Sequence, residues 1–122
     1  MIYKELTSEI ISAFYTVYNT LQSGFLESVY ENSLLIELRK RGLKCEKQKE
    51  ITVYYEGQVV GHYYADIVVE KKVILELKAA ECIHPRHEAQ LMNYLRATKI
   101  EVGLLLNFGK EAKFCRRICT ND

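Results

Sequence analysis

The chain has 122 residues, of which 48% are hydrophobic and 27% charged, and its formal net charge is +1. These values are typical of one globular domain with a buried core, so we predict a single domain over residues 1–122. No apolar run approaches the ~18 residues that a membrane helix needs, and the N-terminus lacks the layout of a signal peptide. We therefore expect a cytoplasmic protein without membrane contact. The near-neutral charge argues against a dedicated DNA-binding domain, although acidic site residues would lower the net charge and leave room for a local basic patch.

The first part of the chain predicts two helices. Apolar side chains recur at three- and four-residue spacing over residues 3–22 and again over 26–41. Gly42 follows three consecutive basic residues, a pattern that is common where a helix ends.

The hydrophobic period then changes from helical spacing to alternation. Alternating residues predict a strand at 51–55, and β-branched and aliphatic runs predict two more at 59–69 and 72–79. The charged segment 70–72 between the last two runs is a predicted hairpin turn. These three strands should form an antiparallel meander.

The last third of the chain predicts a crossover connection. Residues 84–98 return to helical spacing, with a strand at 101–107 and a short edge strand at 114–118. The connection from strand 72–79 through this helix to strand 101–107 is long enough for a parallel βαβ unit. We therefore predict an α/β fold with a mixed central β-sheet flanked by helices.

Asp66, Glu76 and Lys78 form the most informative group of polar residues. If residues 70–72 are the loop, Asp66 faces Glu76 across the hairpin, with Cβ atoms roughly 4.5–5.5 Å apart. Two opposed carboxylates repel each other, and a divalent cation between them would turn the repulsion into binding. Lys78 points to the same face as Glu76. Such a trio is typical of a Mg²⁺-dependent site that cleaves phosphodiester bonds.

The alternative for this trio is a charged, half-solvated sheet face, or a structural Glu76–Lys78 ion pair. The apolar strand around them favours a site, because buried charge needs partners. Three further polar residues are ambiguous on spacing alone. Glu27 has the position of a first-turn glutamate favoured by the helix dipole, while Gln90 and Tyr94 lie along a polar flank beside a core stripe.

Several motifs in order resemble one known family. The segment Gly24–Tyr30 looks like the signature of the GxxExxY family. Later segments that are also similar to it are Tyr64–Asp66, Leu75–Ala79, His87–Leu91, Asn93–Leu95 and Asn107–Gly109. The resemblance covers nearly the whole chain, to about residue 118. It departs from the family at Tyr18, where a histidine is common, and at Ala65, where the superfamily motif has proline.

This family is assigned to the PD-(D/E)XK nuclease-like superfamily, so the resemblance implies a restriction-endonuclease-like core and a Mg²⁺ or Mn²⁺ site. Asp66 and Glu76 would be metal ligands and catalytic residues, and Lys78 the catalytic lysine. Glu27 would be the acidic residue that a helix contributes to the metal. Gln90 and Tyr94 match a Gln-x-x-x-Tyr helix motif and would orient the substrate or the lysine.

The sequence therefore predicts a metal-dependent nuclease that hydrolyses phosphodiester bonds in DNA or RNA. The alternative is a non-catalytic module of the same fold that binds nucleic acid or a protein. A core of this size leaves little room for a recognition domain. A homodimer or a protein partner could then supply the choice of substrate.

Overall fold

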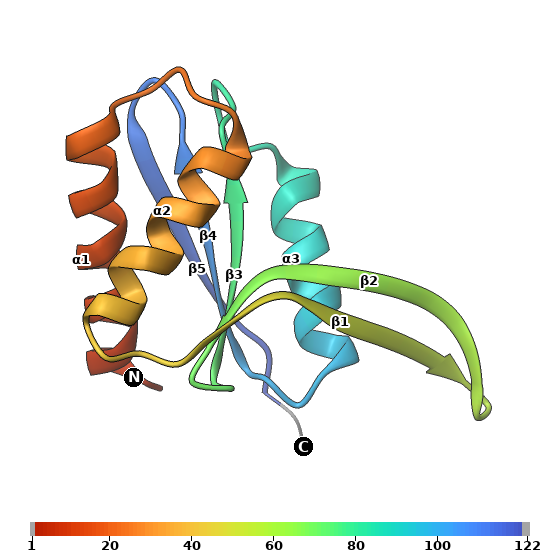
Figure 1. Ribbon diagram of the computed structural model, residues 1–122. Helices are drawn as coiled ribbons and strands as arrows, with labels where there is room; N and C mark the ends of the chain where they lie inside the picture. Colours follow the sequence, from red (N-terminus) through yellow and green to blue (C-terminus); the bar gives the residue numbers. More distant parts are fainter. Residues whose placement is uncertain (1, 121–122) are drawn as a thin grey trace.

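A five-stranded mixed β-sheet forms the centre of the molecule, with helices on both of its faces (Figure 1). The structure is a computed structural model that describes residues 2–120; residues 1, 121 and 122, which the domain prediction included, lie outside the described residues. In chain order the elements are α1 (Lys4–Leu21), α2 (Glu27–Lys40), β1 (Cys45–Tyr55), β2 (Gln58–Val69), β3 (Val73–Lys78), α3 (Pro85–Ala97), β4 (Val102–Phe108) and β5 (Ala112–Ile118).

The strand order is β1-β2-β3-β4-β5. The first three strands form an antiparallel meander, and α3 then carries the chain to β4, which pairs in parallel with β3. β5 returns antiparallel to β4 and forms one edge of the sheet. The predicted α/β fold, the parallel crossover and the final edge strand are therefore confirmed.

The register of the β2–β3 hairpin follows the predicted symmetry about Lys71. Ile67 pairs with Leu75, and the next two pairs follow in step toward the turn. Glu70 and Lys71 have φ angles of 53° and 57°, so the turn reverses the chain through two left-handed residues. Both faces of this paired segment are buried, with Ile67 and Leu75 in the α1–α2 core and Val68 and Ile74 in the α3 core.

The prediction for β1 was wrong at its N-terminal end. The strand begins at Cys45 and not at Ile51. β1 is the other edge strand of the sheet, and its first half carries charged residues, many of them exposed, that hide the alternation on which the prediction relied. A two-residue turn at Glu56–Gly57, with φ angles of 50° and 78°, joins β1 to β2, as in a type I′ hairpin.

Two apolar cores lie on opposite faces of the sheet. α1 and α2 cover one face, where the ring of Phe108 from β4 lies 4.8 Å from Phe14 and 4.4 Å from Tyr30 between ring centroids. α3 covers the other face through Leu91 and Leu95. Gly103 in β4 allows this close approach, since a Cβ there would lie 2.6 Å from Leu91 Cδ1.

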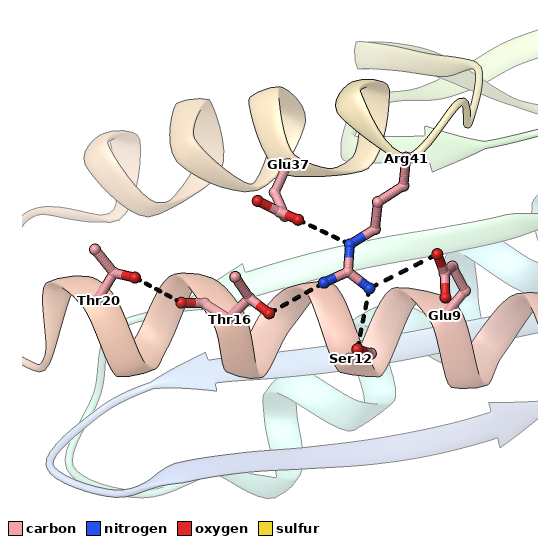
Figure 2. A network of polar contacts seen from close by, with 6 residues as sticks. All are labelled: Glu9, Ser12, Thr16, Thr20, Glu37 and Arg41. Carbon is pink, nitrogen blue, oxygen red and sulfur yellow. Dashed lines mark hydrogen bonds and ion pairs between the residues drawn. The ribbon is translucent and has the colours of Figure 1, made fainter.

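A single arginine joins the two helices of the first layer (Figure 2). Arg41 caps the C-terminal end of α2 and donates from Nε to Glu37 at 2.8 Å. It also donates to the hydroxyls of Ser12 and Thr16 on α1, both at 3.0 Å, and lies 3.7 Å from Glu9. Every nitrogen of the guanidinium thus has a partner, and α2 is held in a fixed position against α1.

Within residues 2–120, no helix has both the length and the apolar character that a membrane crossing requires.

Candidate active site

The site begins at an irregularity in the β1–β2 pair. The pairing omits Gln48 and Asp66, although the residues on both sides of them are paired, and Gln48 has a left-handed φ of 51°. Ala65 packs in the α3 core, whereas Ile67 packs in the α1–α2 core. Residues two apart on a regular strand share a face, so β2 must twist at Asp66. This twist turns Asp66 toward β3 and away from the ladder.

Two backbone-to-carboxylate hydrogen bonds hold Asp66 and Glu76 where the β2–β3 ladder stops. The Asp66 backbone N–H donates to Glu76 Oε1 at 3.1 Å, and the Leu77 backbone N–H donates to Asp66 Oδ2 at 2.8 Å. The regular pairing ends one residue earlier, at Ile67 and Leu75. The two carboxylates are therefore fixed beside each other on adjacent antiparallel strands, which confirms the predicted opposition of Asp66 and Glu76.

A third carboxylate comes from α2. Glu31 is buried on the side of α2 that faces the sheet, with 9% of its surface exposed. Gln48 Nε2 donates to Glu31 Oε1 at 2.8 Å and also lies 3.4 Å from Asp66 Oδ1. Burial and the charge of Asp66 raise the pKa of Glu31, although Gln48 and Lys47, whose Nζ is 3.8 Å from Glu31 Oε2, oppose this effect.

Within this cluster, the pKa of Glu76 departs most from its ordinary value. Burial, followed by the charges of Asp66 and Glu31, raises its pKa to about 8, although the Asp66 N–H and Lys78 act in the opposite direction. At neutral pH the carboxyl group therefore retains a proton unless positive charge is brought to it. Raised pKa values of this kind, with a specific charge partner, are frequent at functional sites.

Lys78 lies at the end of β3, on the wall of a cleft of about 900 Å³ between α3 and the β1–β2 hairpin. Gln90 and Tyr94 of α3 line the same cleft, and Gln90 Nε2 donates to Tyr94 Oη at 2.8 Å. Burial raises the pKa of Tyr94 to about 12, with contributions from Glu76 and Asp66. The phenol therefore remains a proton donor throughout the neutral range, close to the carboxylates.

The strand end that carries Lys78 is anchored from β4. The side-chain amide of Asn107, which is buried, donates to Ala80 O and accepts from Ala80 N, both at 3.0 Å. Gly109 is required beside it, because a Cβ there would lie 2.1 Å from Ala80 O. Tyr18 donates to the carbonyl of Gly109 at 2.9 Å. The tyrosine that departs from the family pattern thus holds the loop that fixes the end of β3.

The structure does not bring together all of the predicted residues. Lys78, Gln90 and Tyr94 line the cleft. Asp66 and Glu76 do not line it, but they lie within electrostatic reach of Tyr94. Glu27 is the exposed first residue of α2, and its carboxylate makes no hydrogen bond or ion pair with any described residue. Glu31, one helical turn later, faces the sheet carboxylates in its place.

Sequence reasoning missed Glu31 and Gln48. Glu31 directly follows Tyr30 of the Gly24–Tyr30 motif, and its spacing of four from Glu27 puts it on the same flank of the helix, which is a signal that could have found it. Gln48 had no such signal, because it lies in the part of β1 that the pattern did not predict.

The donor set of this cluster fits a hard divalent cation. Glu31, Asp66 and Glu76 offer only carboxylate oxygens, which suit Mg²⁺ and Mn²⁺ and do not suit soft metals. Their mutual repulsion, visible in the raised pKa values of Glu31 and Glu76, is what a cation would relieve. Between residues 2 and 120, no three His, Cys, Asp or Glu side chains already form a complete ligand group.

Comparisons with known proteins agree with this architecture. A family model described as the PD-(D/E)XK nuclease superfamily matches residues 4–118. A solved structure titled "Crystal structure of SSO0001" superimposes with a TM-score of 0.61 and 19% sequence identity, over 78% of this chain. The matched part spans half the length of that chain, and the likeness shows a shared fold. Among curated proteins, none matches this chain.

Proposed function

The chain belongs to the PD-(D/E)XK nuclease superfamily, and we propose that it is a Mg²⁺- or Mn²⁺-dependent nuclease that hydrolyses phosphodiester bonds. The observation that carries the proposal is the pair of hydrogen bonds that holds Asp66 and Glu76 side by side, with the pKa of Glu76 raised to about 8. A protein that needed this pair only for stability would be better served by apolar residues of similar volume.

Asp66 and Glu76 would hold the metal ion, with Glu31 as the carboxylate from the helix. Glu31 takes the role that the family resemblance suggested for Glu27, because Glu31 lies within electrostatic reach of both sheet carboxylates. A bound Mg²⁺ or Mn²⁺ supplies Lewis acidity toward the scissile phosphate and lowers the pKa of a bound water. The backbone N–H of Leu77 keeps Asp66 oriented through Oδ2.

Lys78 would act on the attacking water and on the charge that develops on the phosphate. It extends from the same strand as Glu76, two residues on, into the cleft. Its ammonium makes no ion pair with a carboxylate in residues 2–120, so its hydrogen atoms are available for a substrate oxygen. A cation fixed next to the reacting phosphate stabilises the transition state more than the ground state, which is the condition for rate enhancement.

Tyr94 and Gln90 would orient the substrate beside Lys78. The high pKa of Tyr94 keeps its hydroxyl protonated, and a protonated phenol can donate to a phosphate oxygen. Gln90 directs this hydroxyl through its 2.8 Å hydrogen bond. Both residues belong to α3, which places them on the opposite wall of the cleft from β1 and β2.

We also infer that the chain is a member of the GxxExxY family within the superfamily. The support is the motif Gly24–Tyr30 together with its packing. Tyr30 is fully buried against Phe108, and its hydroxyl donates to Gln22 O at 2.6 Å and accepts from Phe25 N at 3.2 Å. The motif tyrosine therefore closes the α1–α2 loop and places the start of α2, one turn before Glu31.

A second candidate function is a nucleic-acid-binding module without catalysis. The observation that favours it is the absence, within residues 2–120, of a complete three-ligand metal group. In such a module Lys78 would contact a phosphate and nothing more.

Cleavage assays separate the two functions. Labelled single- and double-stranded DNA and RNA are incubated with Mg²⁺ or Mn²⁺ and with wild type, Lys78→Ala or Lys113→Ala, where Lys113 is an exposed lysine of β5. We expect cleavage by wild type and by Lys113→Ala, and a loss of about 10²–10³-fold in kcat for Lys78→Ala. Identical activity in Lys78→Ala would assign the cleavage to another site, and an inactive wild type would support the binding module.

A further inference from the structure

The cleft that contains Lys78 runs along almost the whole of α3. Its lining extends from Arg86, in the first turn of the helix, to Ala97 at its last residue. Val53 and Tyr63, from the two strands of the β1–β2 hairpin, form the facing wall. This hairpin projects well beyond the rest of the sheet (Figure 1). The cleft is thus much longer than a site for one phosphate and one metal ion requires.

The cleft concentrates positive charge in a protein whose net charge is only +1. Lys78, Arg86 and Arg96 line it, and none of its lining residues is acidic. Arg86 and Arg96 are ten residues apart on one helix, which corresponds to about 15 Å along the axis. Both are exposed and make no ion pair in residues 2–120. Two guanidinium groups at this separation are suited to two non-adjacent phosphates of one extended backbone.

An aromatic surface accompanies these charges. Tyr63 is 47% exposed on the cleft wall, and its ring lies 5.8 Å from that of Tyr94. Gly61 makes room for the ring, since a Cβ there would come within 3.1 Å of Tyr63 Cε2. Tyr54 and Tyr55, near the tip of the same hairpin, are exposed as well. Half-exposed aromatic rings beside unpaired cations are the arrangement on which unpaired bases stack.

From these features we propose that the cleft binds an unpaired strand of nucleic acid, with its phosphates on Arg86 and Arg96 and a base stacked on Tyr63. A duplex offers phosphates but hides the faces of its bases. A single strand offers both phosphates and base faces. The inference rests on the proposed function, and it specifies that the nuclease acts on single-stranded segments.

Binding in the absence of metal tests this inference separately from cleavage. The full chain in EDTA is titrated into labelled oligothymidylate, oligouridylate and a duplex of the same length, and anisotropy is followed at several salt concentrations. We expect at least one of the two single strands to bind ten-fold or more tightly than the duplex. Tyr63→Leu should weaken binding of the single strand by about 5- to 150-fold. The double variant Arg86→Gln/Arg96→Gln should reduce the slope of log K against log salt by about 1.4.

Matched variants control for charge and for aromatic content. Lys4→Gln/Lys40→Gln removes two exposed charges from α1 and α2, and Tyr15→Leu removes a partly exposed tyrosine of α1. These should bind like wild type. A duplex bound as tightly as the better single strand, or equal losses in the cleft variants and their controls, would overturn the inference. Tight single-strand binding without cleavage in Mg²⁺ or Mn²⁺ would contradict the nuclease proposal alone.

Discussion

Two clusters of charged residues in this protein are built on opposite principles. At the α1–α2 contact, Arg41 meets Glu37 and two hydroxyls, and the Arg41 hydrogen bond lowers the pKa of Glu37 (Figure 2). At the β2–β3 contact, Asp66 and Glu76 face each other, and the pKa of Glu76 rises to about 8. One cluster satisfies its charges within the protein, whereas the other collects charges of one sign.

The two clusters contribute to the free energy of folding with opposite signs. The Arg41 contacts stabilise the fold and leave no group in need of a ligand. The carboxylate cluster costs free energy in the metal-free protein, because burial and like charge both disfavour ionisation. A bound ion would offset a cost of this kind. The two clusters should therefore respond with opposite signs to mutation and pH, and only the carboxylate cluster should respond to metal.

Glu76→Gln should give the largest change in stability. A folded-state pKa of about 8 against an ordinary value of 4.5 means that metal-free wild type loses stability as the pH rises from about 4.5 to 8, with no further loss from this group above that range. Glutamine cannot ionise, so at pH 8 in EDTA we expect the variant to be more stable than wild type by on the order of 2–4 kcal/mol. Urea denaturation at a series of pH values measures this difference.

The control for that experiment is Glu37→Gln at the other cluster. The pKa of Glu37 is lowered, so its contribution to stability is present above its ordinary pKa and is lost as the pH falls through the folded value. Glu37→Gln should therefore destabilise the protein near pH 7. A wild-type stability that does not change between pH 5 and about 8 would contradict the repulsion that we infer at Glu76.

Glu31→Gln should weaken metal binding, and Glu27→Gln should not. Glu31 is buried beside Asp66, whereas Glu27 is exposed at the start of α2. We expect the Kd for Mn²⁺, measured by isothermal titration calorimetry, to rise by about 10- to 100-fold in Glu31→Gln and to stay close to the wild-type value in Glu27→Gln. A larger rise in Kd for Glu27→Gln than for Glu31→Gln would mean that Glu27 is the carboxylate that α2 contributes to the metal.

Arg41→Met should lower the melting temperature without an effect on the metal. Methionine keeps much of the side-chain volume but loses the hydrogen bonds to Glu37, Ser12 and Thr16. We expect a fall in Tm of about 3–8 °C, measured by circular dichroism, and an unchanged Kd for Mn²⁺. A large change in metal affinity would show that the two clusters are coupled through α2.

Gln48→Ala should have the smallest effect. The Gln48 amide is shared between Glu31 and Asp66 and opposes the rise in the pKa of Glu31. Its loss should destabilise the metal-free protein by about 1 kcal/mol near pH 8, and Mn²⁺ should restore most of that loss. A loss that persists at saturating metal would mean that Gln48 acts on the β1–β2 twist and not on the charges.

Local pattern was sufficient to predict the hairpin and the opposed pair. Two β-branched and aliphatic runs on either side of a short charged turn predicted the hairpin. A pairing symmetric about Lys71 then places Asp66 opposite Glu76. The parallel crossover through α3 was predictable for a similar reason, because its length and chain direction leave few alternatives.

Features that depend on tertiary packing were not predictable in this way. Helical spacing puts Glu27 and Glu31 on one flank of α2, but how far α2 extends past the sheet determines which of them reaches Asp66. The left-handed φ of Gln48 and the twist of β2 at Asp66 are local irregularities. They accompany the packing of Ala65 and Ile67 in cores on opposite faces of the sheet. Neither leaves a hydrophobic period in the sequence.

The most direct test of a metal site at Asp66 is thermal unfolding of wild type and Asp66→Asn near pH 8, with and without Mn²⁺. An ion that binds only the native state raises Tm by mass action. We predict a clear rise for wild type, a rise of the same size for the Lys40→Gln control, and none for Asp66→Asn. An equal rise in Asp66→Asn, or no rise in wild type, would contradict the proposal that these carboxylates form a metal site.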